Sequence, residues 1–262
     1  MLKKVFVNGY GSIGSRIIQF INDDPEIEVI GVGKYSPDSK INEAISNGYS
    51  VFVPKTKINN FDKFAISGDI ETALNDCDLV IDASPAGIGF KNKINLYEPK
   101  NLMAIYQGGE SLTGDNAVSD LLFNSRVNYS DAFEKKHVMQ GSCNVTGMGK
   151  ILEPLRRKYG KTLKRFDVTL VRRWADIEQT DKSITDTISL HKVHIMVKML
   201  NPILVRTLHF SSVQLKFQQD RCIYTLWISD LTEKPQHLTK YMICLRMNLV
   251  LHYCGQQKVQ RM

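Results

Sequence analysis

The sequence lacks any apolar run long enough to cross a bilayer, and it has no apolar leader at its start. With a hydrophobic content of 43% and a charged content of 23%, these absences predict a cytoplasmic globular protein with no membrane partner. The five cysteines include no CxxC pair, which argues against a disulfide framework or a metal site. The length of 262 residues favours two domains.

The stretch His191 to Met262 contains no alanine, and it contains only one of the 17 glycines of the chain. This stretch carries ten Lys or Arg against three Asp or Glu, whereas the residues before it balance at 24 against 24. So sharp a change is unexpected within one compact domain. The basic excess accompanies no aromatic stacking pattern or nucleic-acid motif, so we predict no nucleic-acid partner.

The segment Lys3 to Asn8 is apolar, and glycines follow it at GxGxxG spacing before a segment of helical periodicity. Such a strand, tight turn and helix let the backbone approach a pyrophosphate, whose charge then lies at the helix N-terminus. The pattern predicts a dinucleotide site whose cofactor-binding residues include Gly9, Gly11 and Gly14. The alternative is a glycine-rich turn that serves only helix-sheet packing.

The second predicted strand, EIEVIGVGK, ends in Gly33-Lys34, where dinucleotide-binding folds usually carry an acid that binds the adenosine ribose. A lysine at this place would attract a 2'-phosphate, so NADP is predicted to bind at least as well as NAD. Alternatively, Lys34 is a solvated loop residue.

Further apolar runs, at 50–54, 78–84 and 102–109, alternate with helix-like segments. The alternation predicts a doubly wound parallel sheet, the Rossmann type of α/β fold, with its ligand at the carboxyl ends of the strands. By position alone, Ser84-Pro85 and Gly108-Gly109 are expected to line the cofactor site.

The segment GSCNVTG places Cys143 between small and polar residues, just before a predicted helix that ends at Tyr159. A helix N-terminus stabilises a thiolate, and its free N–H groups can bind the oxyanion of a thiohemiacetal. Thr146 or Asn144 is expected to cap this helix. Cys143 is therefore a candidate nucleophile; the alternative is a buried, inert cysteine near a helix start.

Five segments, NGYGSIG, IDASPAGIG, YQGGE, SCNVTG and DVTLVRRWAD, resemble the archaeal type of phosphorylating glyceraldehyde-3-phosphate dehydrogenase in order, over roughly the first 180 residues. The resemblance implies a homotetramer with a dinucleotide-binding Rossmann domain over 1–141 and an α+β catalytic domain over 142–262. It implies that glyceraldehyde 3-phosphate, inorganic phosphate and NAD or NADP react to give 1,3-bisphosphoglycerate through a cysteine thioester.

The same resemblance assigns roles to individual residues. It implies that Cys143 is the catalytic nucleophile and that Ser142 and Asn144 touch the substrate. The cofactor contacts that it implies are Ser12, Ile13, Gly109 and Arg172. No metal is implied.

The family's general base comes from a His-His-Gly segment, which this sequence does not contain. It has HKVHIMVKMLNPI instead, in which His191 or His194 is a weak substitute. If the reading frame of this region is shifted by one base, codons compatible with its residues can encode Ser-His-His-Gly. Further segments of the family appear in the same shifted frame. We therefore hypothesise that the sequence is family-like to about residue 185 and that residues 191–262 are translated out of frame. Sequencing the gene tests this hypothesis. It is contradicted if codons 185–200 do not encode Ser-His-His-Gly in the shifted frame.

An out-of-frame tail predicts impaired activity and an incomplete or disordered catalytic domain, because such a segment has no matched strand or helix pattern. It also weakens the expected tetramer, since the family's interfaces lie largely in that domain. The alternatives are a catalytically inactive dinucleotide-binding protein and another cysteine-dependent semialdehyde dehydrogenase.

Overall fold

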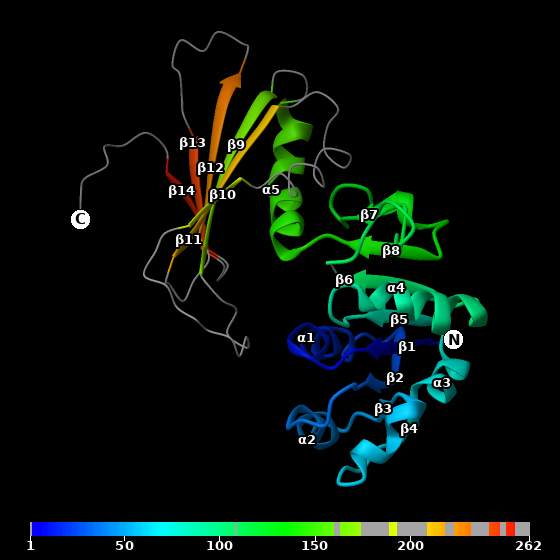
Figure 1. Cartoon of the computed structure of the whole chain (residues 1–262). Helices are drawn as coiled ribbons and strands as arrows, with labels where there is room; N and C mark the ends of the chain where they lie inside the picture. The colour runs from blue at the N-terminus through cyan, green and yellow to red at the C-terminus, as the bar shows by residue number, and fades with distance from the viewer. Residues whose placement is uncertain are drawn as a thin grey trace. The chain divides into compact units, whose positions relative to one another are not determined.

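The computed structural model describes residues 2–107 and 109–159, and beyond them the backbone of six strands. The chain divides into two compact units, Met1–Thr146 and Gly147–Met262. Helix α5 (Cys143–Tyr159) begins in the first unit and continues into the second. Figure 1 shows the elements of both units.

The first unit contains an eight-stranded sheet in the order β4-β3-β2-β1-β5-β6-β8-β7 (Figure 1). Every pair of neighbouring strands in it is parallel. The strands are β1 (Lys3–Asn8), β2 (Ile27–Gly33), β3 (Val51–Val53), β4 (Gly68–Asp69), β5 (Leu79–Asp82), β6 (Met103–Gln107), β7 (Leu122–Phe123) and β8 (His137–Gln140). The predicted doubly wound parallel sheet is confirmed.

Helical segments connect these strands, as the alternating pattern predicted. They are α1 (Ser12–Ile21), α2 (Lys40–Ser46), η1 (Lys55–Phe61), α3 (Ile70–Ala73), η2 (Leu74–Asp76), α4 (Ile88–Asn92), η3 (Lys93–Tyr97), η4 (Glu98–Lys100) and η5 (Tyr129–Ala132). In the described ranges, no helix combines the length and apolar character that a membrane crossing requires.

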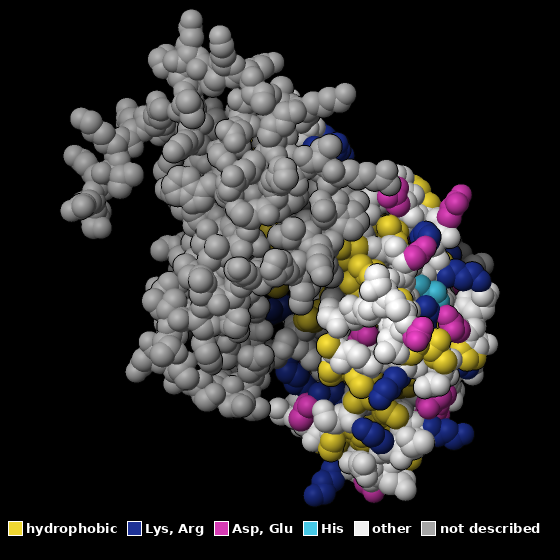
Figure 2. Space-filling view, turned by 45° about the horizontal axis from the view of Figure 1, so that its top comes forward, with side chains coloured by type: hydrophobic (Ala, Val, Ile, Leu, Met, Phe, Trp, Pro, Cys, Tyr) yellow, Lys and Arg dark blue, Asp and Glu magenta, His cyan; other side chains and the backbone are white. Residues whose placement is uncertain are grey.

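The core of the first unit forms where β1 meets its neighbours. Val5, Phe6 and Val7 of β1 are at most 1% exposed, because a strand in the middle of a covered parallel sheet is buried on both faces. A hydrophobic cluster joins Val7 to Ile18 of α1 and Val32 of β2. On the face that Figure 2 shows, basic and acidic side chains are interspersed over this unit rather than gathered by sign.

The second unit contains a mixed six-stranded sheet in the order β10-β11-β9-β12-β13-β14. Its strands are β9 (Leu163–Arg173), β10 (Ser189–Lys192), β11 (His209–Phe217), β12 (Ile223–Leu231), β13 (Tyr241–Arg246) and β14 (Val250–Cys254). Four of these strands lie wholly in the stretch 191–262, for which the sequence predicted an incomplete or disordered domain. Their side chains lie outside the described residues, so the packing of 191–262 stays a prediction.

Candidate functional site

The turn after β1 uses its three glycines in three different ways. Gly9 has a φ of +112°, and a Cβ there would lie 2.8 Å from the Ala83 carbonyl carbon. A Cβ on Gly14 would lie 1.9 Å from the Gly9 carbonyl oxygen, so α1 packs directly on the turn. A Cβ on Gly11 would meet nothing within 4 Å. The turn is thus tight at its first glycine, open at its second and closely packed at its third, as a pyrophosphate-binding turn requires.

Helix α1 begins immediately beyond this open position. Ser12 is its first residue, and the capping residue Gly11 has no side chain to occupy the helix N-terminus. The free N–H groups of such a terminus favour an anion. Ile13 is 52% exposed, so an apolar side chain faces solvent beside the turn. These residues could hold the pyrophosphate of a dinucleotide.

Lys34, directly after β2, is neither a free cation nor a solvated loop residue. It is 6% exposed, and its Nζ lies 2.6 Å from Oδ2 of Asp38. Burial works to raise the pKa of the Asp38 carboxyl, but the hydrogen bond and charge of Lys34, together with hydrogen bonds from Lys40 and Ser36, lower this pKa overall. The alternative of a solvated loop residue was therefore wrong, because the loop after β2 returns a carboxylate to Lys34, whereas binding of a 2'-phosphate by Lys34 stays a prediction.

The loop after β5 lies at the point where the strand order reverses, between β1 and β5, where ligands of doubly wound sheets bind. It starts against the glycine turn, since a Cβ on Gly9 would also meet the Ser84 nitrogen at 2.9 Å. Farther along, a Cβ on Gly109 would lie 3.2 Å from Cβ of Ala86. The two loops expected to line the site therefore approach each other; Gly108 lies outside the described residues.

Cys143 is the first residue of α5, and its side chain is exposed. The Ser142 carbonyl accepts the Thr146 N–H at 2.8 Å, and the Ser142 hydroxyl oxygen lies 3.4 Å from the Val145 nitrogen that donates to it. Ser142 is therefore the N-cap, and the prediction of Thr146 or Asn144 was wrong. Thr146 lies one turn inside the helix and donates its hydroxyl to the Gly141 carbonyl.

Exposure of the thiol contradicts the alternative of a buried, inert cysteine. The Cys143 Sγ lies 3.7 Å from Oδ1 of Asn144, whose side chain is buried. An exposed thiol at the first position of a helix can attack an electrophile from solvent, and the nearby N–H groups can bind the resulting oxyanion.

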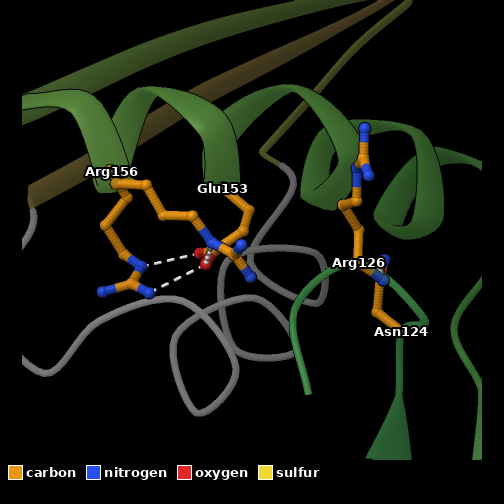
Figure 3. Close-up of polar contacts among 5 residues, drawn as sticks. Asn124, Arg126, Glu153 and Arg156 are labelled. Carbon is orange, nitrogen blue, oxygen red and sulfur yellow. Dashed lines mark hydrogen bonds and ion pairs between the residues drawn. The ribbon is translucent and has the colours of Figure 1, made fainter. Parts of the chain in front are cut away.

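Asn124, which the sequence did not single out, supports this helix start. Its side chain is 3% exposed and donates to the Thr146 carbonyl at 3.3 Å. Its Oδ1 accepts the Arg126 backbone N–H at 3.1 Å; Figure 3 labels both residues. No sequence pattern marks this contact, because the turn that carries Asn124 lies 22 residues before Thr146.

Farther along α5, the buried carboxylate of Glu153 holds two arginines. It accepts hydrogen bonds from Nε and Nη2 of Arg156 at 2.6 and 2.8 Å (Figure 3). It also accepts a hydrogen bond from Nε of Arg157 at 2.7 Å. The hydrogen bond from Arg156 is the main reason why the pKa of Glu153 is lowered despite burial. This cluster stabilises α5 through neighbouring turns of the helix.

No described side chain supplies an evident base for Cys143. His137 is the one histidine whose side chain the structure describes, and it starts β8, whereas Cys143 follows the end of that strand. Nδ1 of His137 lies 2.9 Å from the Tyr106 hydroxyl, and burial lowers the pKa of the ring. The side chains of Arg172 and His191 and all of His194 lie outside the described residues.

No protein-family model matches the chain. Curated relatives named glyceraldehyde-3-phosphate dehydrogenase align with it. The relative from Halobacterium salinarum is 37% identical over 182 residues, which are 68% of this chain and 52% of the relative. The one from Methanothermus fervidus is 36% identical over 184 residues, 69% of this chain and 52% of the relative. The matched chain thus spans about half the length of these relatives.

Among solved structures, the fold is similar to that of an aspartate semialdehyde dehydrogenase with NADP from Candida albicans. The TM-score is 0.59 at 16% identity, covering 90% of this chain and 74% of the other. Such a likeness shows the fold alone. The sequence matches show homology as well as fold. The matched part of this chain is homologous to archaeal glyceraldehyde-3-phosphate dehydrogenases.

Proposed function

We propose that the chain binds NADP or NAD and carries the cysteine nucleophile of a phosphorylating glyceraldehyde-3-phosphate dehydrogenase, with slow turnover because the His-His-Gly segment is absent. The observation that carries this proposal is the position of the glycine turn and Cys143 at one edge of the sheet. The turn follows the carboxyl end of β1, and Cys143 follows that of β8. In a sheet of parallel strands these ends meet at the same edge.

The order β1-β5-β6-β8 places these two ends three strand spacings apart, about 15 Å along the edge. A dinucleotide whose pyrophosphate lies at Gly11 can extend along this edge toward Cys143. The remaining cofactor contacts that we propose are Gly9, Ser12, Ile13, Gly14, Gly109 and Arg172.

The chemistry of the proposed site follows from Cys143. Its sulfur forms a bond to the aldehyde carbon of glyceraldehyde 3-phosphate, and N–H groups at the start of α5 stabilise the oxyanion. NAD(P)⁺ held at the glycine turn would supply the acceptor for the hydride of this carbon. Inorganic phosphate then displaces the thiolate and releases 1,3-bisphosphoglycerate. We propose that Ser142 and Asn144 contact the substrate.

A base is needed to remove the proton of the thiohemiacetal hydroxyl as the hydride leaves, and such a base typically contributes about 10²- to 10⁴-fold. We propose a reduction of this size in turnover relative to a chain that contains the His-His-Gly segment. A cytoplasmic location and a homotetramer remain further proposals.

A substrate panel tests the proposed reaction. With NADP and phosphate, glyceraldehyde 3-phosphate should give NADPH, whereas aspartate semialdehyde should give none. The reverse preference would favour a semialdehyde dehydrogenase. Saturable NADP binding without NADPH from either aldehyde would indicate a catalytically inactive dinucleotide-binding protein.

Cofactor preference should respond to the Lys34–Asp38 ion pair. Replacing Asp38 with Asn removes the carboxylate that lies 2.6 Å from Nζ of Lys34. The Lys34 side chain can then pair with the 2'-phosphate of NADP instead. We expect NADP affinity to rise about tenfold and NAD affinity to change by less than about twofold. Fluorescence titration of both cofactors measures this, with Asp62→Asn, an exposed acid, as the control. Equal changes for both cofactors would show that the pair does not contact the 2'-phosphate.

A further inference from the structure

The loop Ala83–Gly89, which follows β5, borders the cofactor site proposed above. Its start packs on the glycine turn, where a Cβ on Gly9 would lie 2.8 Å from Ala83. If the cofactor binds as proposed, the strand order β2-β1-β5 would put its adenosine ribose at the end of β2 and its pyrophosphate at the end of β1. The half of a dinucleotide beyond the pyrophosphate then lies toward β5 and this loop.

A buried carboxylate fixes the first end of the loop. Asp82 ends β5, is 3% exposed, and accepts hydrogen bonds from the backbone N–H and the hydroxyl of Ser84 through Oδ1. Its Oδ2 accepts the Asn92 amide at 2.9 Å and the Tyr97 hydroxyl at 2.5 Å. Both oxygens of this carboxyl group therefore accept hydrogen bonds from described residues.

The hydrogen bonds continue from Asp82 to the ends of two further strands. The Tyr97 hydroxyl accepts the side-chain amide of Asn8 at 2.6 Å, and Oδ1 of Asn8 accepts the Tyr35 hydroxyl at 2.9 Å. Asn8 ends β1, and Tyr35 lies two residues after β2. A continuous series of side-chain hydrogen bonds therefore fixes the ends of β2, β1 and β5 relative to each other.

A second carboxylate fixes the other end of the loop from a different segment. Oε1 of Glu110, which follows β6, accepts the backbone N–H groups of Gly87 at 2.8 Å and Gly89 at 3.0 Å. Gly87 has a φ of +80°, a conformation that glycine adopts without steric cost. Glu110 therefore holds the end of the loop at Gly87 and Gly89 through their backbone N–H groups.

We propose that Glu110 and Asp82 are positioning residues that hold the Ala83–Gly89 loop in place for the half of the dinucleotide beyond its pyrophosphate. This inference rests on the proposed cofactor binding. Glu110 is the better test of the two, because Asp82 lies in the core network and its loss endangers the fold.

Glu110→Ala and Glu110→Gln in the full chain separate positioning from charge. Glutamine keeps an amide oxygen that can accept both N–H groups, whereas alanine leaves both without their acceptor. We expect the dissociation constant for NADP to rise about tenfold in Glu110→Ala and less than about threefold in Glu110→Gln. The exposed Glu134, which precedes β8, provides the matched control Glu134→Ala.

The ligand 2',5'-ADP, which lacks the nicotinamide half, gives a readout that a purely structural role would not predict. We expect its affinity to stay within about twofold of the unaltered chain in both Glu110 variants. A parallel loss of NADP and 2',5'-ADP affinity with a lower Tm would overturn the proposal, as would equal losses in Glu110→Ala and Glu110→Gln. Failure of the unaltered chain to bind either ligand would contradict the proposed function itself.

Discussion

Gly11→Ala is expected to lower NADP affinity by about 100-fold and to leave the Tm within about 2 °C. The backbone at Gly11 has a φ of −116°, which alanine adopts without strain, and the new methyl group would meet no protein atom within 4 Å. It would instead occupy the space through which a pyrophosphate approaches the backbone. Isothermal titration with NADP and thermal unfolding measure the two effects.

Gly14→Ala provides the contrast to this variant. Its Cβ would lie 1.9 Å from the Gly9 carbonyl oxygen, so α1 must move away from the turn. We expect the Tm to fall by about 5 to 10 °C along with NADP affinity, in line with overpacking costs of about 1–3 kcal/mol.

Normal NADP binding by Gly11→Ala would contradict the proposed pyrophosphate site and would indicate that the glycine turn serves helix-sheet packing only.

Cys143→Ser is expected to reduce aldehyde-dependent NADPH formation by about 10³-fold or more, since a serine hydroxyl is not ionised at neutral pH. NADP affinity should not change, because the substitution replaces one atom of an exposed side chain. Stopped-flow absorbance at the NADPH band and cofactor titration measure the two quantities separately.

Cys77→Ser is the matched control for this loss. The Cys77 thiol donates to the Leu79 carbonyl at 3.2 Å, and burial raises its pKa to about 11. It is therefore a weak nucleophile at neutral pH, and its replacement should leave NADPH formation within about twofold. A similar loss in both variants would indicate damage to the fold rather than removal of the nucleophile.

The regular elements of residues 2–159 follow largely from local sequence. Strand β1 occupies Lys3–Asn8 as predicted, and α5 ends at Tyr159 as predicted, because apolar patterning and glycine spacing act over a few residues. The open position at Gly11 likewise agrees with the role that the GxGxxG spacing implies.

Contacts between loops could not be predicted in this way. The pairing of Lys34 with Asp38 depends on the path of the chain after β2, and the sequence before β3 also offers Glu43 as a partner. Oε1 of Glu110 accepts hydrogen bonds from residues more than 20 positions earlier in the chain, so no local pattern marks this contact. The cap of α5 was misplaced because GSCNVTG offers three capping residue types, and only the backbone conformation selects Ser142.

The stoichiometry of the first turnover tests the account most directly. The full chain is mixed with NADP, glyceraldehyde 3-phosphate and phosphate, NADPH is followed, and the quenched protein is digested for peptide mass spectrometry. We predict a slow rise to about one NADPH per chain, an acyl adduct on Cys143 and very slow turnover afterwards. NADPH without an adduct on Cys143 would contradict the assignment of the nucleophile, and fast multiple turnover would contradict the absence of the base.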